Sequence, residues 1–225
     1  MRTITRDAPL PTVGARTSST STQPVVALKR RTIDSLLISL GAVATVVLVV
    51  AGGLLTWGAN FSKDYVNDEL SSQNIAFPPA AALTEEGRTD LLKFAGQDVN
   101  TGVEAEGYAS FIDGHLQGIA DGATFADLGV PERAAATAVE TATADGASAA
   151  RIAELQGEAD AISGQRNSLF KGETLRGLLL SAFAWSTVGR IAGIAAMAAF
   201  VAGGAMLVLV GLGLRHHHKV VVQTR

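Results

Sequence analysis

Histidine is the first side chain to consider, because it binds transition metals and moves protons near neutral pH. The chain has four histidines: His115 stands alone in the middle, and the other three form the run 216–218. A metal at His115 would need carboxylate ligands such as Glu104, Glu106 or Asp113. A single histidine on a helix flank more often packs or is solvated, and the C-terminal run suits a polar cap beside a membrane. The sequence therefore predicts no metal or cofactor site.

The residues for other common enzyme chemistries are missing as well. Cysteine is absent, so neither a thiolate nucleophile nor a disulfide can form. A Ser/His/Asp arrangement has only one histidine to draw on in the middle of the chain, and no phosphate-binding glycine loop occurs. The basic residues cluster at the ends of two apolar segments, which favours lipid over nucleic acid as a partner. We expect a protein that is not an enzyme and does not bind nucleic acid.

The two apolar segments are long enough to cross a membrane. Ser35 to Trp57 is a run of 23 residues without a formal charge, and Ile191 to Leu214 is another of 24. A helix needs about 20 residues to span the hydrocarbon core of a bilayer. The first segment is too long for the core of a typical signal peptide, so we expect an uncleaved anchor. The sequence predicts transmembrane helices over 33–57 and 190–214.

Basic residues next to the two segments predict the orientation. Residues 29–31 are all basic and precede the first segment, while Arg215, Lys219 and Arg225 follow the second. Basic flanks stay on the cytoplasmic side of a membrane. The segment 58–189, which holds 8 Lys and Arg against 19 Asp and Glu, then lies outside. We expect a cell-membrane protein with two spans, both termini cytoplasmic and residues 58–189 extracytoplasmic.

The two cytoplasmic tails are short. Residues 1–32 are rich in Ser and Thr and poor in apolar groups, and such a segment cannot bury enough surface to offset the entropy lost on ordering. The sequence therefore predicts a disordered tail over 1–32 and a short basic tail over 215–225. Neither tail is long enough to hold a signalling domain.

Helical spacing predicts helices throughout the middle of the chain. Apolar residues recur at helical spacing over 60–77, which predicts a stalk that continues the first span until Pro78 and Pro79 end it. Thr84 and Thr124 are candidate N-caps, and Asn100 or Thr101 is a third. A long amphipathic helix leads into the second span, with a seven-residue gap in its apolar stripe at Arg166 and a possible break near Gly172.

Together these patterns predict an all-α membrane protein, because no stretch alternates at period two. Two transmembrane helices flank an extracytoplasmic helical domain, and the stalk helices are continuous with the spans. The outer domain is rich in Ala and Gly, so its core is thin and a partner or a second copy would stabilise it.

Two sets of residues are candidates for contacts. Small residues four apart let helices approach closely in lipid, and such pairs or runs occur in both spans. They are Gly41, Thr45, Gly52, Thr56, Ala195, Ala199 and Gly203. Turn-forming and apolar residues of the outer domain are candidates for packing or for an interface with a partner. They are Gln73, Phe77, Pro78, Tyr108, Phe111, His115 and Leu116.

Three segments carry a resemblance to a family. The stretches ELSSQNIAFPP, YASFIDGHLQGIADGATFADL and LRGLLLSAFAW resemble actinobacterial membrane proteins with two spans and an outer helical domain, over roughly residues 30–215. Chains of this group are sometimes labelled ring-opening dioxygenases. A non-haem iron site of that kind needs two histidines and a carboxylate on one side of the membrane, and only His115 lies between the spans. The residues therefore do not support that label.

The leading hypothesis is a non-enzymatic integral membrane protein whose outer domain mediates protein–protein interaction or self-assembly, as a homo-oligomer or with another membrane protein. The alternative is a module that binds a small molecule or a component of the cell envelope, with Tyr108 and His115 facing a pocket between helices. An exposed apolar patch on the outer domain favours the first hypothesis, whereas an enclosed pocket with convergent polar groups favours the second.

Overall fold

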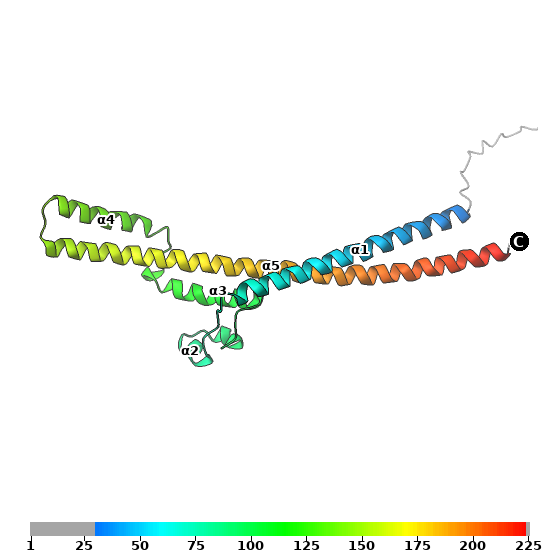
Figure 1. Cartoon of the computed structure of the whole chain (residues 1–225), viewed down its shortest axis with the longest axis horizontal. Coiled ribbons are helices and arrows are strands. Elements are labelled where there is room, and N and C mark those ends of the chain that lie inside the picture. Colours follow the sequence, from blue (N-terminus) through cyan, green and yellow to red (C-terminus); the bar gives the residue numbers. More distant parts are fainter. Residues whose placement is uncertain (1–29, 224–225) are drawn as a thin grey trace, which may run out of the picture.

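The structure, a computed structural model, describes residues 30–223 and is helical throughout its regular elements (Figure 1). The predicted tail over 1–32 lies outside the described residues except for its last three positions. In chain order the elements are α1 (Arg30–Ser71), α2 (Ala80–Glu85), the 3₁₀ helix η1 (Thr89–Phe94), α3 (Gly102–Gln117), the 3₁₀ turn η2 (Ala120–Gly122), α4 (Gly129–Ala144) and α5 (Ala149–Gln223).

Helix α5 is the longest helix, and α1, α3 and α4 all pack against it. It has 75 residues and is about 110 Å long at the α-helical rise. Figure 1 shows α4 folded back along its first part, α3 beside its middle and α1 along its last part. The apolar segments 33–57 and 190–214 therefore lie within longer helices, and α5 continues through most of the basic segment 215–225.

The contact stripe of α5 repeats every three and four residues along nearly its whole length. That average of 3.5 residues is the coiled-coil period, which keeps one face of a helix toward its partner. Against α4 the covered positions are Ile152, Leu155, Ala159, Ile162, Arg166 and Leu169. Against α1 they are Ala192, Ala196, Ala199, Gly203, Met206, Val210 and Gly213, and the matching positions of α1 are Ile38, Gly41, Thr45, Leu48, Gly52, Leu55, Ala59, Ser62 and Val66.

Most of the small residues that the sequence singled out lie in this stripe. Gly52 of α1 faces the ring of Phe200, and Gly203 of α5 faces Leu48. Thr56 was expected in the contact but is exposed, and its hydroxyl donates to the carbonyl oxygen of Gly52 at 2.8 Å. The stripe alternates steps of three and four residues, so positions spaced strictly four apart move off it. Residues 55 and 59 therefore make the contact in place of Thr56. Ala195 lies at the edge of the stripe for the same reason.

The two apolar segments meet the part of the chain between them where three helices converge. The hydroxyl of Ser62 on α1 donates to the carbonyl oxygen of Trp185 on α5 at 2.6 Å. A Cβ at Gly189 would lie 2.8 Å from the Cβ of Ser62. A Cβ at Gly102, the first residue of α3, would collide with the side chain of Ser186. Small residues therefore set how closely α1, α3 and α5 approach.

Helix α1 ends before it reaches Pro78 and Pro79, which were predicted to end it. It stops at Ser71, six residues before Phe77, so the predicted stalk over 60–77 is too long. Asn74 takes a left-handed conformation at φ 51°, which turns the chain out of the helix. Residues 75–78 then run antiparallel to 96–99, with backbone bonds such as Phe77 N–H to the carbonyl oxygen of Gln97 at 2.9 Å. Pro79 instead precedes the first residue of α2.

Two of the predicted caps are wrong, and the predicted break does not occur. Thr101 caps α3 in a capping box with Glu104, as expected. Thr124 exchanges hydrogen bonds with Asp127 in the turn before α4, but the N-cap of α4 is Leu128. Thr84 lies inside α2 and donates to a carbonyl oxygen one turn back, because Pro79 had already started that helix. Gly172 does not interrupt α5 but makes room for the side chain of Leu116.

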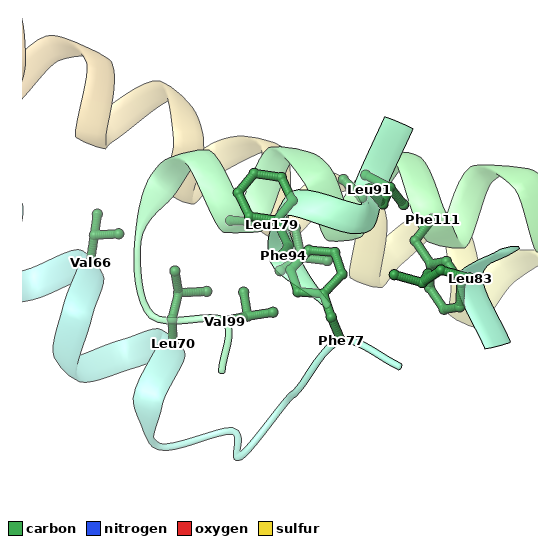
Figure 2. Packing of buried hydrophobic residues seen from close by; sticks show 11 residues of the cluster. Val66, Leu70, Phe77, Leu83, Leu91, Phe94, Val99, Phe111 and Leu179 are labelled. Carbon is green, nitrogen blue, oxygen red and sulfur yellow. The ribbon is translucent and has the colours of Figure 1, made fainter. Parts of the chain in front are cut away.

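The part of the chain between the two apolar segments has a small core where α1, α3 and α5 meet the segment 75–99 (Figure 2). Leu83 and Val99 are the largest side chains that are fully buried. The rings of Phe77 and Phe94 stack at 5.1 Å between centroids. The cluster consists of Val66, Leu70, Phe77, Leu83, Leu91, Phe94, Val99, Ala105, Ala109, Phe111 and Leu179. Outside it only Leu116, Leu128 and Leu169 form a second buried cluster among the described residues.

Arg166 fills the gap in the apolar stripe of α5 and fixes the base of the α4–α5 hairpin. Its guanidinium lies 2.6 Å from a carboxylate oxygen of Glu132 on α4 and 3.9 Å from the ring centroid of Phe125. It also donates to the carbonyl oxygen of Phe125 at 3.2 Å. The stripe thus continues through a charged residue because its partner side chains are an acid and an aromatic ring.

The contact at Gly189 gives the first testable prediction. The variant Gly189→Ala should be less stable by about 1–3 kcal/mol, because the added methyl group cannot fit against Ser62. The matched variant Gly177→Ala, on the same helix, places its methyl group in open space. It should be more stable by about 0.5–1 kcal/mol, because alanine favours the helix. Thermal unfolding of the purified full chain measures both, and equal shifts would contradict the packing described here.

Candidate functional site

Three of the residues proposed for an interface lie in the core. Phe77, Phe111 and Leu116 are buried, so they hold the domain together and are not available to a partner. Tyr108 is half-buried, with its ring edge-on to Phe77 at 5.3 Å between centroids. These residues share helical spacing with true surface residues, so the sequence could not separate packing from an interface.

His115 is exposed at the end of α3 and has local partners. Its Nδ1 lies 3.0 Å from the carbonyl oxygen of Phe111, and its Nε2 lies 3.6 Å from a carboxylate oxygen of Glu86. It lines a shallow cavity with Glu86, Arg88, Phe111 and Gly114. Tyr108 does not line that cavity, so the predicted pocket shared by Tyr108 and His115 does not form. No group of three His, Asp or Glu residues suited to a metal occurs between residues 30 and 223.

Gln73 and Pro78 belong to the chain reversal after α1. Gln73 is exposed in the turn, and its side-chain amide lies 3.2 Å from the hydroxyl of Ser72. Pro78 is half-buried, and its carbonyl oxygen accepts the N–H of Gly96 at 3.1 Å. Pro78 therefore shapes the fold, while Gln73 is free to meet a partner.

Arg88 ties the segment before η1 to α3. Its guanidinium lies 2.9 Å from a carboxylate oxygen of Asp90 and donates to the carbonyl oxygen of Ser110 at 2.8 Å. The hydrogen bond from Arg88 lowers the pKa of Asp90, and the same bond raises the pKa of Arg88. No local pattern predicts this contact, because Arg88 and Ser110 are 22 residues apart along the chain.

Three aromatic rings form a column at the C-terminal end of the first apolar segment. Trp57, Phe61 and Tyr65, one turn apart on α1, stack with ring centroids 5.8 and 6.1 Å apart. Their exposed fractions are 68%, 56% and 50%. Ser62 and Val66, each one residue further on, occupy the packing face of α1 instead. We call these three residues the aromatic column.

A cleft opens where α1, α5 and the beginning of α3 meet. Its volume is about 470 Å³. Lys63 of α1 and Arg190 of α5 line it, together with amide side chains and an apolar wall. The sequence predicts Arg190 at the end of the second span. It does not predict that Arg190 lines the same cleft as Lys63, because that arrangement depends on the close approach of α1 and α5 at Gly189. We call this site the three-helix cleft.

Comparison of the chain with models of protein families, with curated proteins and with solved structures found no match. The site is therefore interpreted from its own geometry.

The partial burial of Tyr108 gives a prediction about pH. Burial raises the pKa of Tyr108 above the ordinary tyrosine value of about 10. The folded chain therefore holds this proton to higher pH than the unfolded chain. The stability that this difference contributes is complete below the ordinary pKa and is lost as pH rises through the raised one.

The variant Tyr108→Phe has no such proton and should lose less stability between neutral pH and about pH 11 than the unmodified chain. Unfolding temperatures across this range measure the difference. Tyr65→Phe is the control, because the ring of Tyr65 is exposed on the aromatic column. An alkaline slope that is the same for Tyr108→Phe and the unmodified chain would show that burial of Tyr108 has no such effect.

Proposed function

We propose that this chain is a non-enzymatic integral membrane protein that crosses the membrane twice, over 33–57 and 190–214. Only 17% and 11% of the most apolar stretches of α1 and α5 are buried within the molecule. The core helix of a soluble protein would be mostly covered, and a continuous exposed apolar surface needs lipid around it. The actinobacterial two-span proteins that the chain resembles would share this arrangement.

The basic flanks place both termini in the cytoplasm and residues 58–189 outside. In this orientation Trp57 lies at the outer boundary of the bilayer, where aromatic side chains are enriched. The positively charged ends of α1 and α5 lie together at the opposite end of the helix pair (Figure 1).

The outer domain, in this proposal, serves self-assembly, and the observation that supports it is the aromatic column. Its three rings lie beside the contact stripe of α1 and are half or more exposed, so the described chain leaves much of each ring uncovered. Tyr65 is two helical turns, or about 12 Å, beyond Trp57, which takes its ring past the boundary of the apolar core. An exposed apolar patch of this kind was the feature expected of an interaction module.

A second copy is the partner that fits the column best. Copies in one membrane have the same orientation and depth. A twofold axis along the membrane normal therefore places the same residues of two copies at the same depth, facing each other. Each ring of the column then meets the matching ring of its neighbour. The thin core of the outer domain also favours an assembly that buries more apolar surface.

The orientation can be tested with single cysteines, because the native chain has none. Ala150→Cys, near the tip of the α4–α5 hairpin, should react with a membrane-impermeant maleimide in intact cells. Ser18→Cys, in the N-terminal segment, should react only after the cells are opened. Labelling of Ser18→Cys in intact cells would contradict the proposed topology.

Self-assembly can be tested with Asp68→Cys, which lies on the face of the column beyond Tyr65 and leaves all three rings in place. Mild oxidation of membranes should give a disulfide-linked dimer. Lys63→Cys, on the side of α1 nearer α5, is the matched control and should give little. Adding Phe61→Ser and Tyr65→Ser to the reporter should reduce the dimer several-fold. Equal crosslinking with and without the two rings would contradict assembly through the column.

A further inference from the structure

The three-helix cleft combines two cationic side chains with neutral polar ones. Lys63 and Arg190 contribute the charges, and Asn60, Asn67 and Asn100 contribute amide groups that can both donate and accept hydrogen bonds. Ala59, Val66 and Val103 contribute apolar surface. The cleft therefore suits a ligand that carries negative charge, hydroxyl or ester oxygens, and some apolar surface.

The charge of the cleft is opposite to that of the segment around it. Acidic residues outnumber basic ones 19 to 8 over residues 58–189, yet no Asp or Glu lines the cleft. The other arginines of the outer domain that pair with acids do so elsewhere, such as Arg88 with Asp90 and Arg166 with Glu132. Among the described residues neither Lys63 nor Arg190 forms an ion pair. Both cations are therefore available to an anion.

Close packing fixes the shape of the cleft before any ligand enters. The side-chain amide of Asn67 donates to the carbonyl oxygen of Asn100 at 3.1 Å, which ties α1 to the segment before α3. The close approach of Gly102 to Ser186 and of Gly189 to Ser62 holds the three helices together. A preformed site of this kind loses little conformational entropy when it binds.

The position of the cleft identifies the source of the anion. Ala59 follows Trp57 by two residues, and Arg190 is the first residue of the second apolar segment, so the cleft lies at the end of both segments. Given the proposed membrane placement, on which this inference rests, that level is the headgroup layer of the outer leaflet. On the cytoplasmic and matrix sides of membranes, basic pockets between helices bind anionic lipid headgroups, and the same charge complementarity applies to a cleft at the outer surface.

We propose that the three-helix cleft binds the headgroup of an anionic phospholipid, with Lys63 and Arg190 holding the phosphate. The asparagine side chains supply hydrogen bonds to the glycerol and ester oxygens, and the apolar wall contacts the start of the acyl chains. The bound lipid bridges α1 and α5 and so supports the junction between the spans and the outer domain.

The test uses the full chain in nanodiscs of phosphatidylcholine with a minority of phosphatidylglycerol. Lipids that remain bound after mild purification are counted by native mass spectrometry. The unmodified chain should retain phosphatidylglycerol well above its bulk share. The double variant Lys63→Gln with Arg190→Gln should lower this enrichment roughly tenfold, since it removes both cations at the membrane surface. Lys171→Gln, which removes one exposed cation far along α5, should leave it unchanged.

The outcomes separate this inference from the proposed function. Enrichment that is unchanged in the double variant overturns the lipid site, whatever the topology. Soluble glycerol phosphate that raises the unfolding temperature as much as the lipid overturns the lipid as ligand and leaves a phosphate site. Maleimide labelling of Ala150→Cys in the double variant shows that the chain still inserts correctly. A failure of that labelling in the unmodified chain would instead overturn the membrane placement.

Discussion

The structure depends on a single contact stripe along α5. Each of α4, α3 and α1 covers a different length of it, and the three helices contact one another far less than they contact α5. A repeat of 3.5 residues drifts by about 20° per heptad around a straight helix, so partners that follow it wind around α5. The side chains of the stripe change along its length. Leucine and isoleucine predominate beside α4, whereas Ala and Gly predominate over 192–203, which lies beside residues 48–59 of α1. That change matches the two solvents proposed for the molecule, since close packing of small residues replaces the hydrophobic effect in lipid.

The convergence of α1, α3 and α5 joins the two parts of the molecule. Gly102, Gly189, Ser62 and Ser186 are small, and their size lets three backbones approach where larger residues would hold them apart. The same approach creates the three-helix cleft, because helices that meet at a point diverge on either side of it. The buried cluster around Phe77 and Leu83 then sits directly beyond the junction. The compact part of the outer domain is thus built on the junction and not on the hairpin, whose outer surface is mostly polar.

The sequence was sufficient for the helical class, the two long apolar helices and a cap of α3 at Asn100 or Thr101, of which the structure has Thr101, because these follow from local composition and spacing. It was not sufficient for the end of α1, since the prolines at 78 and 79 are obvious helix breakers but the turn at Asn74 acts first. It also could not assign the faces of the stalk: Phe61 and Ser62 are neighbours, and the larger ring looks like the better core residue. The contact needed a small hydroxyl instead, because α5 approaches closely there. Lys63 and Arg190 line one cleft only because α1 and α5 approach closely at Ser62, and no local sequence pattern predicts that tertiary contact.

The continuity of α5 has a mechanical consequence. No proline or break interrupts it from Ala149 to Gln223, although Gly172 and Gly177 lie in its course. The turn over 145–148 stands about 60 Å beyond Arg190, at the helical rise for some 40 residues. A continuous helix resists compression and twisting along its axis, so a load applied at that turn is transmitted along α5 as a push or a rotation. Apart from that turn, the loops within residues 30–223 all lie between α1 and α4. A force applied at the turn would therefore be transmitted along α5 to the opposite end of the molecule, while α1, α3 and α4 pack along its sides.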